Sequence, residues 1–170
     1  MSGGVNVATN DSFERFFRDE HTRVLGLAIA WTGDHQLARD ITQETFLRAY
    51  RSWPHVSTLE APRAWLRRVT VNLLIDGHRR RVRERSALER HGAGAGASTV
   101  TFADPAATAW WDAVRDLPDR QRAAVALYYL DDHSIAEVAD VLGIAEGTVK
   151  SSLSQARKTL ARTLRIEEVG

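Results

Sequence analysis

The sequence has no cysteine, one methionine and four prolines among its 170 residues. Without cysteine, the chain can form neither disulfide bonds nor thiolate metal sites. No segment approaches the roughly 18 to 20 consecutive apolar residues that span a membrane. Residues 1–4 do not begin the basic-then-apolar pattern of a secretory signal. We therefore expect a cytoplasmic protein that does not insert into a membrane.

The sequence also lacks the residue spacings that catalytic and cofactor sites require. Its six histidines are scattered and form no pair at metal-ligand spacing. Gly92, Gly94 and Gly96 follow no predicted strand and open no predicted helix, so they form no phosphate-binding loop. The run Asp-Asp-His at 131–133 is better interpreted as a solvated turn than as a metal site. We expect no catalytic residue, no metal and no cofactor, and hence no enzyme.

Net charge is small, at +1, but it is distributed unevenly. Residues 62–90 contain nine basic and three acidic side chains, a net charge of +6. Residues 91–144 contain three basic and eight acidic side chains, a net charge of −5. Residues 145–170 are basic again, with five basic and three acidic side chains. Two basic segments fit a protein that contacts phosphates at two places, although solvated helix faces explain them equally well.

The clearest break in the chain is at residues 91–99, which are small, glycine-rich and have nothing large to bury. Asp104 also predicts non-helical backbone, because a residue that precedes proline avoids the α region. No segment alternates convincingly as a strand does. We therefore predict an all-α fold of two small helical domains, 10–85 and 108–165, joined by a flexible linker at 86–107.

Apolar residues at helical spacing predict three helices in the first domain, at about 10–32, 35–53 and 63–85. The candidate N-cap residues of the first helix are Asn10, Asp11 and Ser12. Gly33 separates the first helix from the second, and Pro54 ends the second. Pro62 opens the third helix, where its missing N–H group costs nothing.

The second domain has the pattern of a helix-turn-helix. Ser134 and Glu137 form a capping-box pair at the start of a short helix, and Gly143 supplies the left-handed residue that ends it. A longer helix follows over about 146–164, with Ala145 at its uncapped start. Its apolar side leaves polar and basic residues outward, which suits base edges and phosphates in a major groove.

Three segments together resemble the extracytoplasmic-function (ECF) sigma factors of RNA polymerase. Residues 38–50 (ARDITQETFLRAY) resemble the polymerase-docking helix of that family, and residues 64–81 resemble its −10-reading helix. Residues 117–122 (LPDRQR) and 134–157 resemble its C-terminal domain, which reads the −35 element. The resemblance implies a factor that directs core RNA polymerase to specific promoters, with sigma region 2 at 10–85 and sigma region 4 at 108–165.

The same resemblance implies three sets of binding residues. Those for the −35 element are Glu146, Thr148, Lys150, Ser151, Ser154, Gln155 and Arg157. Those for the −10 element are His55, Val56, Ser57, Asn72, Asp76, Arg79 and Arg80. Those for polymerase are Asp40, Gln43, Glu44, Leu47 and Arg48. The implied partners are core RNA polymerase (the coiled coil of its largest subunit, and its flap), promoter DNA and an anti-sigma factor.

One departure and two alternatives bear on these assignments. Many relatives carry an aromatic residue near the position of Val56, and valine cannot stack on an extruded base as phenylalanine does. A LuxR-type helix-turn-helix regulator is the nearest alternative, but it leaves the first domain unexplained. A pure protein-interaction module is the other, and its binding to partners would not involve DNA contacts of Lys150 or Arg157.

Overall fold

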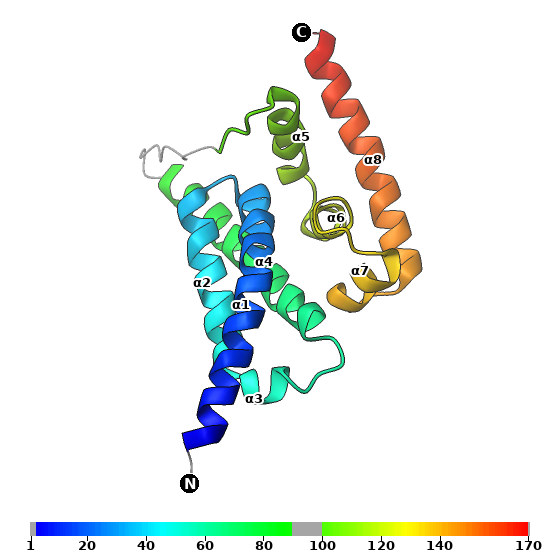
Figure 1. Cartoon of the computed structure of the whole chain (residues 1–170). Coiled ribbons are helices and arrows are strands. Elements are labelled where there is room, and N and C mark those ends of the chain that lie inside the picture. Colours follow the sequence, from blue (N-terminus) through cyan, green and yellow to red (C-terminus); the bar gives the residue numbers. More distant parts are fainter. Residues whose placement is uncertain (1–2, 90–99, 170) are drawn as a thin grey trace.

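The computed structural model describes residues 3–89 and 100–169. Every regular element in these two ranges is helical, which confirms the all-α prediction. The first lobe contains α1 (Gly3–Thr32), α2 (His35–Arg51), α3 (Trp53–Val56) and α4 (Pro62–Glu89). The second lobe contains α5 (Pro105–Arg115), α6 (Asp119–Val125), the π-helical turn η1 (Ala126–Leu130), α7 (Ile135–Leu142) and α8 (Glu146–Val169) (Figure 1).

The turn between α1 and α2 forms where glycine was predicted to break the helix. Gly33 has a φ of 63°, a left-handed conformation that glycine adopts readily. Asp34 then caps α2 by accepting a 2.9 Å hydrogen bond from the Leu37 amide. Arg81 of α4 donates a 2.7 Å hydrogen bond to the other carboxylate oxygen of Asp34, and this bond holds the pKa of Asp34 below its ordinary value. A single carboxylate thus links the start of α2 to α4.

Two predicted helix ends in the first lobe are wrong. Helix α1 already runs through residues 10–12, so these do not cap it, and the Ser12 hydroxyl instead accepts a 2.8 Å hydrogen bond from the Trp53 indole. Helix α2 ends at Arg51, before Pro54 is reached. Trp53 and Pro54 open the short helix α3, where proline fits because the first turn needs no N–H group.

Helix α5 was not predicted and begins inside the segment interpreted as linker. Asp104 is its N-cap and accepts a 2.9 Å hydrogen bond from the Ala106 amide, while Pro105 occupies its first turn. Asp104 has the extended backbone that the following proline predicts, and Pro105 begins a helix. Trp111 and Val114 on this helix are buried. Residues 90–99 of the predicted linker lie outside the described residues.

The helix-turn-helix forms as its sequence predicts. The Ser134 hydroxyl accepts from the Glu137 amide at 3.2 Å, and the Glu137 carboxylate accepts from the Ser134 amide at 2.7 Å. Gly143 ends α7 with a φ of 64°. The Ala145 carbonyl accepts from the amides of the first turn of α8, and alanine offers no side-chain cap.

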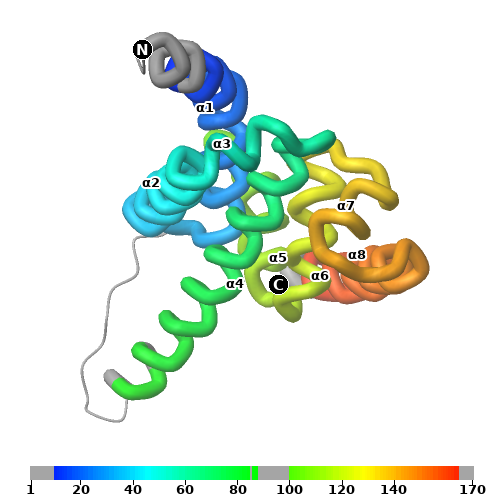
Figure 2. Tube along the Cα trace, turned by 90° about the horizontal axis from the view of Figure 1, so that it is seen from below, coloured from blue at the N-terminus to red at the C-terminus, as the bar shows by residue number. Residues whose placement is uncertain are grey.

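The two lobes share one hydrophobic core. Trp31 of α1 and Leu74 of α4 belong to the same buried cluster as Trp111 of α5, Leu127 of η1 and Val149 of α8. Figures 1 and 2 both show the second lobe seated against α1 and α4, whereas the last turns of α4 project away from the body. The prediction of two small lobes did not anticipate this arrangement, in which each lobe covers apolar surface of the other.

The π-helical turn η1 lies between α6 and the helix-turn-helix. Its defining hydrogen bond runs from the Asp131 amide to the Ala126 carbonyl, five residues earlier, at 3.3 Å. The turn ends at Asp131, whose side chain is buried. Asp132 follows with a φ of 53°, so residues 131–133 form the predicted turn. Among the described residues no group of acidic, histidine or cysteine side chains could hold a metal ion.

Candidate nucleic-acid interface

Helix α8 separates an apolar side from a polar side. Val149, Leu153 and Ala156 are buried against the rest of the second lobe. The seven residues predicted to read the −35 element are exposed or half-buried, namely Glu146, Thr148, Lys150, Ser151, Ser154, Gln155 and Arg157. The predicted residues therefore lie together on the open side of one helix.

Local contacts order the side chains on this polar side but leave most of their hydrogen-bond donors unoccupied. Lys150 lies 4.0 Å from a carboxylate oxygen of Glu146, an exposed pair that water screens strongly. Gln155 accepts a 3.2 Å hydrogen bond from the Gln121 side chain of α6. Arg157 approaches the Tyr129 hydroxyl at 3.4 Å. The lysine ammonium and most guanidinium donors stay available to bases and phosphates.

The proposed −10 residues of α4 share one helix face. Asn72, Asp76, Arg79 and Arg80 are all exposed and follow the i, i+4, i+7, i+8 spacing of a single side. Arg80 lies 3.5 Å from Glu84, one turn further along the helix. Arg79 forms a 3.2 Å ion pair with Asp119, which belongs to the second lobe. One cation of this otherwise open face is therefore paired with an acid of the second lobe.

Val56 does not belong to this surface. Its side chain is fully buried beside Trp53 in the short helix α3, whereas His55 and Ser57 on either side are exposed. A side chain with no exposed area cannot contact an extruded base, so the assignment of Val56 to −10 binding is corrected. Trp53 and Val56 are three residues apart, a spacing typical of one buried helix side.

The predicted docking residues form an exposed stripe along α2. Glu44 and Arg48 pair at 2.7 Å across one helical turn, and Asp40 accepts a 3.0 Å hydrogen bond from Gln36. Leu47, between these charged residues, is 38% exposed. An exposed apolar residue flanked by charges is typical of a protein-binding surface.

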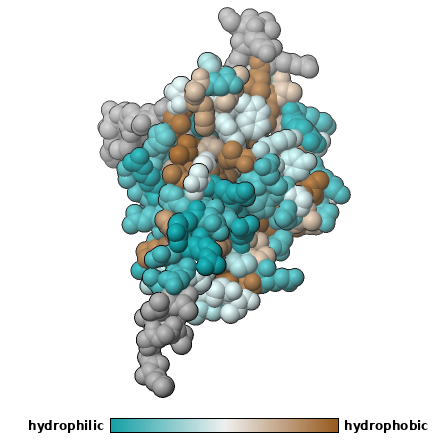
Figure 3. Space-filling model, viewed as in Figure 1, coloured by the Kyte–Doolittle hydropathy of each residue, from teal (hydrophilic) through white to brown (hydrophobic). Residues whose placement is uncertain are grey.

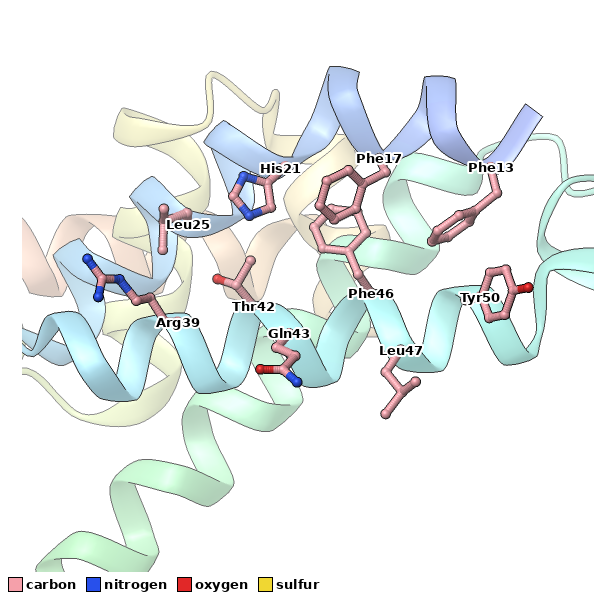
Figure 4. A pocket seen from close by; sticks show the side chains of 10 residues that line it. All are labelled: Phe13, Phe17, His21, Leu25, Arg39, Thr42, Gln43, Phe46, Leu47 and Tyr50. Carbon is pink, nitrogen blue, oxygen red and sulfur yellow. The ribbon is translucent and has the colours of Figure 1, made fainter. Parts of the chain in front are cut away.

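Leu47 and Gln43 border an apolar groove between α1 and α2, which the sequence did not predict. The groove has a volume of about 590 Å³, and its other lining residues are Phe13, Phe17, His21, Leu25, Arg39, Thr42, Phe46 and Tyr50 (Figure 4). Two of its aromatic side chains are open to solvent, since Phe17 of α1 is 37% exposed and Tyr50 of α2 is 52% exposed. The face of the molecule drawn in Figure 3 is largely hydrophilic, with apolar residues in small groups. The i, i+4 spacing of Phe13, Phe17 and His21 is the sequence signal for this groove.

Comparisons with known proteins cover both lobes. The family model for Sigma-70 region 2 matches residues 16–84, and that for Sigma-70, region 4, matches residues 108–160. The ECF RNA polymerase sigma factor SigL of Mycobacterium tuberculosis is 37% identical over 96% of this chain and 94% of its own. SigM of the same organism is 34% identical over 90% of this chain and 77% of its own.

Two solved structures share the fold. The sigma factor RpoE of Bartonella quintana, in complex with the anti-sigma factor NepR, superimposes with a TM-score of 0.75. It is 23% identical and covers 91% of this chain and 98% of its own. CnrH, in complex with the cytosolic domain of CnrY, gives a TM-score of 0.68 at 21% identity, covering 92% of this chain and 90% of its own. The LuxR-type alternative is not favoured, because the region 2 match accounts for the lobe which that alternative leaves unexplained.

Proposed function

Because the chain belongs to the ECF sigma factors, which direct RNA polymerase to promoters and initiate transcription, we propose a task for each exposed face. Helix α8 reads the −35 element, α4 together with the exposed His55 and Ser57 reads the −10 element, and α2 docks on polymerase. With this division we propose region 2 at 10–85 and region 4 at 108–165.

The observation that carries the proposal is the two-sided character of α8. A capped α7, a left-handed Gly143 and the buried Val149 fix how α8 projects from the lobe. Helices held in this way place their first turns in the major groove. Ser151 and Lys150 then reach base edges, whereas Arg157, two turns further along, reaches phosphate.

For the −10 element, the proposal uses Asn72, Asp76, Arg79 and Arg80 of α4 together with His55 and Ser57. Asparagine presents a donor and an acceptor to a base, and arginine engages phosphate or guanine. Any base taken out of the stack must be held by the exposed His55 and Ser57, since Val56 lies in the core. A pocket without an aromatic platform holds such a base less tightly.

For polymerase, the proposal uses Asp40, Gln43, Glu44, Leu47 and Arg48 on α2. Leu47 supplies an apolar anchor at the edge of the groove, and the charged residues around it steer association. The partners are the coiled coil of the largest subunit for the first lobe and the flap for the second. The catalytic chemistry belongs to polymerase, and this chain contributes binding energy and position.

Regulation and location follow from the same assignment. The sigma factor RpoE of Bartonella quintana was solved with the anti-sigma factor NepR, and we propose that an inhibitor of this kind covers the docking faces of this chain too. None of the described helices is long and apolar enough to cross a membrane. We propose that the chain acts in the cytoplasm, where polymerase and promoter DNA are found.

Run-off transcription with purified core polymerase on a library of promoter sequences tests the proposal. The expected result is a set of transcripts that depends on this chain and shares −10 and −35 sequences. Arg18→Ala is the control, because it removes an exposed cation of α1 that lies away from the α4 and α8 faces. It should leave these transcripts unchanged. If no transcript depends on the chain at any salt concentration, the proposal is wrong.

A further inference from the structure

A second cavity lies between α4 and the turn that joins α5 to α6. Its volume is about 1080 Å³, and it shares no lining residue with the apolar groove between α1 and α2. Four arginines line it, namely Arg79 and Arg83 of α4, Arg115 of α5 and Arg122 of α6. Three aspartates line it as well, so the arginines leave the cavity with an excess of positive charge.

Arg122 is a buried cation in the wall of this cavity. Only 3% of the residue is exposed, and its Nε and Nη1 have no hydrogen-bond partner in the part of the chain that the structure describes. Its Nη2 donates a 2.9 Å hydrogen bond to the Leu117 carbonyl and lies 3.4 Å from a ring nitrogen of His78. Burial lowers the pKa of Arg122, although nearby aspartates oppose this effect. Neither hydrogen-bond partner is an acid, so an anion in the cavity would stabilise this charge.

Arg115 adds a second buried donor to the same wall. Its Nε donates a 3.0 Å hydrogen bond to the Ala30 carbonyl, and its Nη1 pairs with Asp112. Its Nη2 is covered and has no hydrogen-bond partner within residues 3–89 and 100–169. Three buried donor atoms without a partner thus belong to two arginines that line one cavity. Buried polar groups normally have partners, so this concentration points to a ligand of opposite charge.

The α4 side of the cavity supplies donors that a ligand can reach. Arg79 and Arg83 lie one helical turn apart and are both exposed. Arg79 forms the ion pair with Asp119 through its Nε, and the Arg83 Nε donates a 3.3 Å hydrogen bond to the Arg79 carbonyl. Guanidinium groups recognise phosphate through their paired N–H donors. The other two aspartates of the lining, Asp76 and Asp116, are exposed, so water screens their repulsion.

The shape of the cavity favours a small ligand over nucleic acid. The backbone of a duplex lies on a broad convex surface and cannot approach a side chain as buried as Arg122, whereas a small anion can enter the cavity. The arginines occupy two walls, α4 on one side and α5 with α6 on the other, so an anion with two phosphate groups can meet both. Val82 and Leu117 add apolar lining that suits the sugar or base of a nucleotide.

We propose that this cavity binds a small anion with at least two phosphate groups, either inorganic pyrophosphate or the diphosphate end of a nucleotide. Arg79 and Arg83 donate hydrogen bonds to one phosphate, and Arg115 and Arg122 attract the other from the buried wall. Because the Nε and Nη1 atoms of Arg122 are covered, its effect is chiefly electrostatic, and a charge in a poorly solvated wall acts more strongly than one in water. Binding can be measured without polymerase or DNA, so the proposal stands apart from promoter recognition.

The first test is calorimetric titration of the full chain with sodium pyrophosphate at an ionic strength fixed with sodium chloride. We expect saturable binding of one pyrophosphate per chain. Arg83→Gln should weaken this binding by roughly tenfold, because it removes a charged donor. Arg120→Gln is the matched control, since it removes the same charge from an exposed position of α6 that does not line the cavity. It should leave the affinity unaltered.

The second test concerns the buried wall. Arg122→Gln should also weaken pyrophosphate binding by roughly tenfold, and Arg122→Lys, which keeps the charge, should lose less. Circular dichroism shows whether each variant folds. If Arg122→Gln does not fold, the comparison of Arg83→Gln with Arg120→Gln decides the question.

The source of the phosphates is tested by competition. Adenosine diphosphate should displace pyrophosphate, and adenosine should not. Tighter binding of adenosine diphosphate than of pyrophosphate would identify the ligand as a nucleotide, and the reverse would identify it as the inorganic anion. The proposal is wrong if pyrophosphate does not bind saturably, or if Arg83→Gln and Arg120→Gln weaken its binding equally. It is also wrong if Arg83→Gln weakens the binding of duplex DNA but not that of pyrophosphate.

Discussion

The guanidinium group of Arg115 lies directly against Gly33. A Cβ atom at Gly33 would come within 2.9 Å of the Arg115 Cζ, and the Arg115 Nε donates a 3.0 Å hydrogen bond to the Ala30 carbonyl at the end of α1. The residue that lets the chain turn between α1 and α2 therefore also makes room for a side chain of the second lobe. Glycine is required here by its backbone conformation and by its lack of a side chain.

Gly33→Ala should lower the free energy of unfolding by about 1–2 kcal/mol, since a left-handed alanine carries that strain even before the contact with Arg115. Urea denaturation followed by circular dichroism measures the change. Gly26→Ala is the matched control, because a Cβ there meets nothing within 4 Å, and in a helix alanine is more stable than glycine by up to about 1 kcal/mol. Equal effects at the two positions would contradict the prediction.

Leu47→Ala should weaken binding to core polymerase by roughly 5- to 30-fold on every promoter, because truncation removes an apolar anchor worth about 1–2 kcal/mol. Leu47 is already 38% exposed, so the unfolding midpoint should change little. Affinity for core polymerase is measured by fluorescence anisotropy without DNA. Val82→Ala removes a 51% exposed apolar side chain from α4 and should leave this affinity intact.

Arg157→Ala should weaken binding to all −35 duplexes alike and reduce the slope of log affinity against log salt by about 1, as expected for a lost phosphate contact. Lys150→Ala or Ser151→Ala should instead change which −35 sequence is preferred. Binding titrations on a −35 duplex library at several salt concentrations distinguish the two effects. A change of base preference in Arg157→Ala would show that this residue reads bases.

Acid should destabilise the wild-type chain partly through Asp34. Its pKa is lowered chiefly by the Arg81 hydrogen bond, so its stabilising contribution is present above the ordinary aspartate pKa and is lost as pH falls through the lowered value. Asp34→Asn keeps a capping oxygen but does not titrate, so stability should fall less steeply below about pH 4. Urea midpoints from pH 7 to pH 2 measure this. Asp104→Asn, at the exposed N-cap of α5, is the control, and an equal loss of slope there would contradict the assignment.

Local features of the fold could be predicted because they depend on a few neighbouring residues. The Ser134–Glu137 capping box begins α7 and Gly143 ends it, and both form as these neighbouring residues predict. Asp104 and Pro105 are also a local signal, of an N-cap followed by proline at a first turn, but the same pair fits a linker. Only the burial of Trp111 against the rest of the fold shows that a helix, and not a linker, follows these residues.

The binding faces could be predicted only in part. The polar side of α8 follows from helical spacing. The burial of Val56 depends on the short helix α3, which is too short for a repeat of apolar residues to predict it. The buried ion pairs of Arg67 with Glu20 and Asp131 could not be predicted, because the three residues lie far apart in the sequence and each resembles a surface charge. Nothing local distinguishes a buried arginine from the exposed arginines around it.

The π-helical turn makes the contact between the two lobes depend on the length of the chain as well as on its side chains. Its five-residue hydrogen-bonded step holds one residue more than an α-helical step would. Deleting any one residue from Ala126–Leu130 would rotate everything that follows by about 100° around the helix axis. Asp131 would then point away from Arg67 with both side chains still present. An insertion or deletion at this turn changes no charge, yet it would change whether the two lobes can pack against each other.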